Sequence, residues 1–247
     1  MIYSRKSILN FLQKKLKRSQ PSIENYVFDL NTKYDLQTFK IINELLRGDS
    51  NAIDIGAHKG QILKKIIEAS PNGTHFAFEP LPELSQNLHK QYKNSTTVFP
   101  FALSDFDGVS NFNYVITNPA YSGLIKRKYD RPEMDTTIQV PVRKLDNVIP
   151  KDVPIHFIKI DVEGGEYAVL KGASELLKKW KPVMIYEQGL GGSDINGTGP
   201  EEFYDFLCSF GYHISLMEYY LLKKEPLSKE EYAQQFRKGY NYYFIAY

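Results

Sequence analysis

The chain has 247 residues, of which 42% are hydrophobic and 24% are charged, so it suits one globular domain and not a disordered or collagen-like protein. Its net charge of +2 conceals an uneven distribution. Residues 1–20 hold six basic side chains and no acidic one, whereas the other 25 basic and 29 acidic residues give the rest of the chain a charge of −4. The single cysteine, Cys208, excludes an internal disulfide and a cysteine-based zinc site.

The N-terminal segment is basic and amphipathic. Ile8, Leu9, Leu12 and Leu16 share one helical face, but they are too interrupted for the core of a signal peptide. No apolar run approaches the roughly 20 residues of a membrane span. We therefore expect a soluble, cytoplasmic protein with a basic helical arm over residues 1–35 and one main domain over residues 36–247.

The elements that follow alternate in type. Asp35 can cap a helix over residues 35–47. Short apolar strands are then expected at 51–55, 74–79, 95–103, 155–161 and 182–187, and helices at 61–69, 82–92, 166–180 and 200–210. This alternation predicts βαβ units and a parallel sheet that is covered on both faces. Strand-like pieces around a polar loop interrupt it at 109–142, and strands at 212–218 and 241–247 are expected to pair antiparallel at a sheet edge.

Ligands of such sheets bind outside the carboxyl ends of the strands, where the first candidate motif lies. It reads Asp54-Ile55-Gly56-Ala57-His58-Lys59-Gly60. The spacing of its glycines differs from the dinucleotide fingerprint, and the sequence contains no P-loop. An acid followed by two glycines suits a ligand that lacks a pyrophosphate and carries a positive charge. Gly56 allows close approach of the backbone, and Gly60 allows the following helix to pack.

Three further strand ends carry polar residues, and the first two are those of the strands expected at 74–79 and 95–103. Glu79 is placed to accept hydrogen bonds from two vicinal ribose hydroxyls, and with Asp54 it describes S-adenosylmethionine (SAM) better than NAD or ATP. Ser104 and Asp105 can meet an adenine edge or simply form a turn. Asp54 can likewise be a turn acid, and Glu79 a solvated strand end.

The strand over 155–161 has the most specific ending, Lys159-Ile160-Asp161-Val162-Glu163-Gly164-Gly165-Glu166. The strand period of two places Lys159 and Asp161 on one face, close enough to interact. Asp161 ends an apolar strand, where an acid is costly unless it meets a ligand or a partner. Glu166 is interpreted as a first-turn acid of the following helix.

These motifs together resemble the FkbM family of SAM-dependent methyltransferases. The resemblance rests on D-I-G-A-x-x-G, F-E-P-x-P, A-L-S-D-x-x-G and K-I-D-V-E-G-x-E-x-x-V-L-x-G-A, and it covers about residues 51–190. Asp146 and Ser122-Gly123-Leu124 also have family-like settings. His58 and Lys59 stand where the family often shows asparagine and a small or apolar residue.

The resemblance implies an α/β fold, the Rossmann-like class I methyltransferase sandwich, with a mostly parallel seven-stranded sheet and an antiparallel C-terminal edge strand. It also implies SAM as cofactor and a hydroxyl of a sugar, glycan or related small molecule as acceptor. Asp54, Gly56, Ala57 and Gly60 should surround the methionine part of SAM. Glu79 should hold the ribose, Ser104 and Asp105 should border the adenine, and Asp161 should face the sulfonium and the acceptor.

Methyl transfer to a hydroxyl requires a group that removes its proton. We expect Asp161 in this role, followed by Glu163 and then His58. Asp161 can instead bind the SAM amino group or a divalent metal, which the sequence does not otherwise indicate. The basic loop over 118–133 can serve as a lid or simply be solvated.

Two alternatives remain open. One is an RNA methyltransferase that uses the basic arm, which the charge of −4 on residues 21–247 disfavours. The other is a non-catalytic module that either binds SAM or associates with an anionic membrane surface through residues 1–20.

Overall fold

The computed structural model describes residues 23–193, 195 and 197–247, so the amphipathic segment of the expected arm lies outside the described residues. The chain divides into two units, Met1–Leu36 and Gln37–Tyr247, and the site described below belongs to the second. Helix α2 spans Ile23–Leu45. Asp35 therefore lies inside a helix and does not cap one as expected, because residues 23–34 contain neither proline nor glycine to interrupt the helix.

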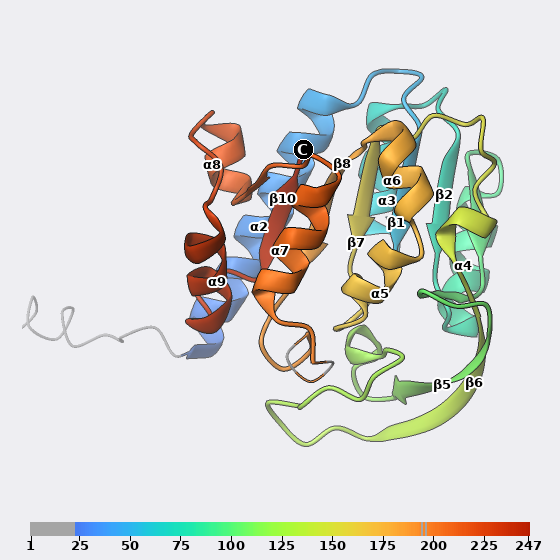
Figure 1. Cartoon of the computed structure of the whole chain (residues 1–247). Coiled ribbons are helices and arrows are strands. Elements are labelled where there is room, and N and C mark those ends of the chain that lie inside the picture. Colours follow the sequence, from blue (N-terminus) through green and yellow to red (C-terminus); the bar gives the residue numbers. More distant parts are fainter. Residues whose placement is uncertain (1–22, 194, 196) are drawn as a thin grey trace, which may run out of the picture. The chain divides into compact units, whose positions relative to one another are not determined.

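A seven-stranded sheet forms the centre of the second unit, in the order β3-β2-β1-β7-β8-β10-β9 (Figure 1). The strands are β1 (Ala52–Ile55), β2 (His75–Phe78), β3 (Thr96–Phe99), β7 (Phe157–Ile160), β8 (Val183–Glu187), β9 (Ile214–Ser215) and β10 (Tyr243–Ala246). The first five pair in parallel, which confirms the expected doubly covered α/β fold. The C-terminal strand β10 is antiparallel, as expected, but β9 pairs on its outer side and occupies the edge.

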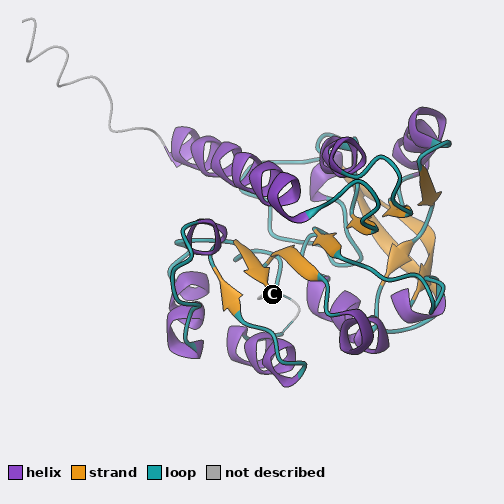
Figure 2. Cartoon of the chain, turned by 90° about the horizontal axis from the view of Figure 1, so that it is seen from above, coloured by secondary structure: helices purple, strands orange, loops and turns teal. Residues whose placement is uncertain are grey.

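Helices cover both faces of this sheet (Figure 2). They are α3 (Gln61–Ala69), α4 (Pro82–Tyr92), α5 (Glu166–Lys171), α6 (Ser174–Trp180), α7 (Pro200–Ser209), α8 (Met217–Leu221) and α9 (Lys229–Arg237). The single helix expected over 166–180 is two helices. The Asp146 carboxylate accepts hydrogen bonds from the amides of Glu175 and Leu176, which starts a new helix after Gly172. The family-like position of Asp146 is thus explained by helix capping.

A second sheet, ordered β4-β6-β5, lies near the end of the large sheet at which the parallel strands finish (Figure 1). It consists of β4 (Ala102–Leu103), β5 (Gly108–Val115) and β6 (Asp135–Arg143). The strand expected over 95–103 is therefore wrong as a single element, because β3 ends at Phe99 and β4 joins β6 instead. Two short 3₁₀ helices are also present: η1 (Pro119–Tyr121) lies between β5 and β6 in sequence, and η2 (Leu145–Asn147) follows β6. The strand expected over 212–218 shortens to β9, and α8 follows it.

The central strands are buried on both faces, which explains their apolar sequences. Two charged residues break that pattern, since Asp54 of β1 lies opposite Lys159 of β7 in the strand register. Both side chains are buried, with 2% and 4% exposure. Among the described residues, no helix combines the length and the apolar character needed to cross a membrane.

Candidate active site

A cavity opens where β1, β2, β3 and β7 end. Its walls come from four strand ends and from the loop after β5, and they consist of Ile55, Gly56, His58, Phe78, Glu79, Pro80, Leu81, Phe101, Ala102, Leu103, Phe112, Pro119, Ala120, Ser122, Leu124, Asp161, Val162, Glu163 and Gly165. Most of these side chains are apolar, and the few polar ones converge from β1, β2 and β7. That composition is typical of a small-molecule site at the switch point of an α/β sheet.

Gly56 brings the end of β1 against the loop after β7. Its φ of +77° lies in the left-handed region, and a Cβ at this position would stand 1.8 Å from the carbonyl oxygen of Asp161. Its amide donates a hydrogen bond to the carbonyl of Phe78, 3.0 Å away. Only glycine allows this contact among three strand ends, and the contact shapes the floor of the cavity.

Glu79 is a buried carboxyl group that faces the cavity from the end of β2. Its Oε2 accepts from the His58 amide at 2.8 Å, and its Oε1 accepts from the Leu81 amide at 2.9 Å. Burial raises the pKa of Glu79 to about 7, although the two hydrogen bonds by themselves would lower it. The backbone thus holds the carboxyl group in one orientation, while its oxygens retain lone pairs for ligand hydroxyls.

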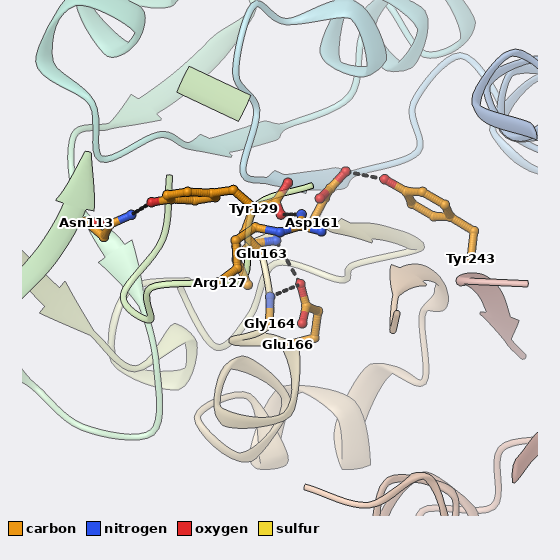
Figure 3. Close-up of polar contacts among 9 residues, drawn as sticks. Asn113, Arg127, Tyr129, Asp161, Glu163, Gly164, Glu166 and Tyr243 are labelled. Atoms are coloured by element: carbon orange, nitrogen blue, oxygen red, sulfur yellow. Dashed lines mark hydrogen bonds and ion pairs between the residues drawn. The ribbon is translucent and has the colours of Figure 1, made fainter. Parts of the chain in front are cut away.

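Asp161 is the most firmly held acid of the site (Figure 3). Its Oδ2 lies 3.1 Å from the Lys159 Nζ and also accepts a hydrogen bond from the Tyr243 hydroxyl. The expected contact between Lys159 and Asp161 is therefore confirmed. Burial would raise the pKa of Asp161, but Lys159, Glu187 and Tyr243 lower it to about 2. A carboxylate with so low a pKa is a weak base, so the structure disfavours the general-base role that we expected for Asp161.

Glu163 faces the same cavity in a different electrostatic setting. It forms an ion pair with Arg127, whose guanidinium lies 4.5 Å from the centre of the Tyr121 ring. Burial and the nearby Asp161 raise the pKa of Glu163 to about 8, against the opposing effect of Arg127. This pKa lies nearer the range of a general base than the pKa of Asp161 does.

His58 and Glu163 both have strained backbones. In the described part of the chain, four non-glycine residues have positive φ, and these two, at +48° and +58°, line the cavity. The other two, Lys181 and Lys223, follow the ends of α6 and α8, where a left-handed residue is usual. Strain without such a cause is common at functional sites.

The His58 ring lies in the cavity wall. Burial lowers its pKa, and its buried Nε2 has no hydrogen-bond partner among the described residues. Its amide is the donor that orients Glu79. The backbone of His58 thus has a clear positioning contact, which the side-chain motif did not predict.

Three carboxyl groups gather beside the cavity. Asp161, Glu163 and Glu187 each offer an oxygen within 4.8 Å of the others, a spacing that can hold a metal ion. Lys159 already contacts Asp161, and Arg127 already contacts Glu163, so two of the three acids face a protein cation. We therefore assign no metal ligands here.

Five residues expected at the cofactor do not line this cavity. Asp54 is buried in the middle of β1, where burial raises its pKa to about 7 and the Leu63 amide is its hydrogen-bond partner. Ala57 packs in a core cluster with Leu63 and Leu88. A Cβ on Gly60 would stand 2.6 Å from Leu88, so Gly60 serves the packing of α3 on α4.

Ser104 and Asp105 are the other two. Asp105 forms an ion pair with Lys171 at 2.6 Å, and a Cβ on Gly172 would stand 2.1 Å from the Ser104 carbonyl oxygen. Both therefore pack against the end of α5. The residues just before them, Phe101–Leu103 in sequence, line the cavity instead, and the last two form β4, which pairs with β6 in the second sheet.

The loop over 118–133 contributes to the wall of the cavity. Ser122 and Leu124 line the cavity, and Arg127 binds Glu163. The Lys128 amide donates to the Gly191 carbonyl at 3.2 Å, which joins the loop to the glycine-rich segment after β8. Sequence motifs did not reveal Tyr243 or Phe112, since each lies on a strand without a recognisable signature.

Comparison with known proteins places the chain among methyltransferases. The NoeI 2-O-methyltransferase of Sinorhizobium fredii (strain NBRC 101917 / NGR234) is 25% identical over 192 residues, and the match covers 72% of this chain and 77% of NoeI. The crystal structure of methyltransferase FkbM from Methylobacillus flagellatus KT has the same fold, with a TM-score of 0.51 and 16% identity over 85% of this chain. This chain spans 50% of the length of that structure. The family model of the methyltransferase FkbM domain matches residues 54–214, and the chain therefore belongs to the FkbM methyltransferase family.

Proposed function

We propose that the protein transfers the methyl group of SAM to a hydroxyl of a sugar or glycan. The observation that carries this proposal is Glu79, a buried carboxyl group that two backbone amides hold at the wall of a largely apolar cavity. Paired ribose hydroxyls are suitable donors to such a group. The similarity to NoeI, a 2-O-methyltransferase, supports a sugar hydroxyl as the acceptor.

The order of the strands suits the order of the adenine, ribose and methionine parts of SAM. Phe101 and Leu103 near β3 offer an apolar contact for the adenine, and Glu79 at β2 suits the ribose. Gly56 at β1 and Asp161 at β7 come next, so the methionine part would lie over them. When bound, SAM supplies a methyl group on a positively charged sulfur, which is the reactive group of the transfer.

The acceptor must lie in line with that methyl group, and such alignment can contribute about 7–11 kcal/mol to lowering the barrier. Glu163 is the best placed proton acceptor, since it lines the cavity and its pKa of about 8 suits the task. Glu163 would take the hydroxyl proton as the new C–O bond forms. Asp161 remains a permanent anion beside the cofactor.

Two measurements test the proposal. Calorimetry should detect binding of SAM to the purified full chain. Methyl transfer should then be screened with chitooligosaccharides, methyl glycosides and nucleotide sugars, with and without Mg²⁺, by mass spectrometry of the products. Absence of SAM binding would exclude the proposed activity, and methylation of RNA with no sugar modified would replace it by the nucleic-acid alternative.

Glu79→Gln should weaken SAM binding by about tenfold or more, because it removes the carboxylate and leaves the amide of His58 or Leu81 facing an amide nitrogen that cannot accept a hydrogen bond. The exposed Glu83 on the neighbouring helix provides a matched control, and Glu83→Gln should leave the Kd unchanged. Calorimetry on both variants makes the comparison. Equal SAM affinity in the wild type and Glu79→Gln would mean that the ribose lies elsewhere.

A further inference from the structure

Tyr243 reaches the site from a part of the chain that carries no family motif. It lies on β10, beyond residues 54–214 that match the family model, and it pairs with Glu187 of β8 in the strand register. Its hydroxyl donates a hydrogen bond to the Oδ2 of Asp161 (Figure 3). Burial and the Asp161 charge raise the pKa of Tyr243 well above its usual value, so the hydroxyl keeps its proton and acts only as a donor to this carboxylate.

Lys159 contacts both of these residues. Its Nζ lies 3.1 Å from the same Oδ2 and 4.5 Å from the centre of the Tyr243 ring. Both donors therefore hold one oxygen of Asp161, while Asp161 still lines the cavity. Two contacts from different strands leave the carboxylate little freedom to rotate, and they keep it ionised.

Acidic side chains outnumber basic ones around Asp161, but burial raises the pKa of Asp54, Glu163, Glu166 and Glu187. The titratable groups that interact with it electrostatically are Asp54 and His58 from β1 and its loop, Lys159, Glu163 and Glu166 from β7 and the start of α5, Glu187 from β8 and Tyr243 from β10. Lys159 is the permanent cation of this set. Asp161, whose pKa is lowered to about 2, is the acid of this set that stays ionised, and it can pair with a positively charged group of a ligand.

We propose that Tyr243 is a positioning residue, whose hydroxyl holds the Asp161 carboxylate against the sulfonium of bound SAM, so that the site prefers SAM to the neutral thioether S-adenosylhomocysteine (SAH). The inference rests on the proposed SAM site, in which the strand order places the sulfur beyond Glu79, over β1 and β7. Loss of the sulfonium charge on transfer would then weaken the hold on the product and favour its release.

The test compares the Kd values of SAM and SAH for the full chain by calorimetry. Tyr243→Phe keeps the ring beside Lys159 and removes only the hydroxyl. It should raise the Kd of SAM by about tenfold, the value of a hydrogen bond to a charged group, and change the Kd of SAH by less than about twofold. The control Tyr240→Phe, at a tyrosine that is 54% exposed, should change neither value.

A double-mutant cycle separates positioning from a merely structural effect. Asp161→Asn should remove the preference for SAM, and Tyr243→Phe in that background should have no further effect on the SAM Kd, because the two residues act as one unit. If Asp161→Asn does not fold, the SAM-to-SAH ratio of Tyr243→Phe decides alone.

The outcomes are distinct. An equal loss of SAM and SAH affinity in Tyr243→Phe, or an unchanged SAM affinity, overturns the inference and leaves the proposed function intact. Additive effects in the cycle overturn it as well. A wild-type chain that binds neither ligand overturns the proposed function and this inference together.

Discussion

Glu163→Gln should lower the rate of methyl transfer by about 10²–10⁴-fold, the usual contribution of a positioned general base. The change removes the proton acceptor but keeps the shape of the side chain and an oxygen for Arg127. SAM binding should remain within about threefold of the wild type, since the proposed cofactor contacts are made by other residues. The rate is measured on an acceptor identified by the sugar screen, and the SAM Kd by calorimetry.

The pH dependence of the methyl-transfer rate is a second measurement that tests the role of Glu163. The base works in its deprotonated form, so the wild-type rate should rise with pH through a midpoint near 8, the pKa of Glu163. Glu163→Gln should lose this rise. Glu175→Gln, at an exposed first-turn acid of α6, is the matched control and should keep both the rate and the profile. A Glu163→Gln enzyme with the wild-type rate would remove Glu163 from the mechanism.

Gly56→Ala should destabilise the fold by roughly 2–5 kcal/mol and abolish measurable SAM binding. About 1–2 kcal/mol comes from placing a side chain at positive φ, and about 1–3 kcal/mol from overpacking, since the new Cβ would stand 1.8 Å from the Asp161 carbonyl oxygen. Relief of this clash must move the loop that carries Asp161 and Glu163. Urea denaturation and calorimetry measure the two effects.

Gly197→Ala separates the two contributions. Gly197 has nearly the same φ, +74°, but a Cβ there would meet no atom within 4 Å. It should therefore show only the conformational cost of about 1–2 kcal/mol and retain SAM binding. Similar stability losses in the two variants would show that the contact between Gly56 and the β7 loop is not tight in solution.

The elements with strong local patterns were predicted well. The bounds of α3 and α4 match the sequence expectation, because each helix has its apolar residues at helical spacing and a glycine or proline at its start. The contact between Lys159 and Asp161 also follows from the strand period alone. These features depend on residues that are near one another in the chain.

The differences from the sequence expectation arise where distant segments meet. Ser104 and Asp105 follow a strand end, as an adenine-binding pair would, but β4 joins β6 and turns both residues toward α5. Asp161 has the position of a general base, but Tyr243, 82 residues later in the chain, donates a hydrogen bond to it. Local spacing carries no information about either event.

The sequence by itself determined the alternating strands and helices, the strand ends that carry Gly56, Glu79, Asp161 and Glu163, and the family. It did so because periodicity, turn glycines and short motifs are local properties of the chain. Only the tertiary structure decided which acids line the cavity and in which direction the pKa of each one shifts. Those properties depend on burial and on partners such as Arg127 and Tyr243, which the folded chain brings together from other elements.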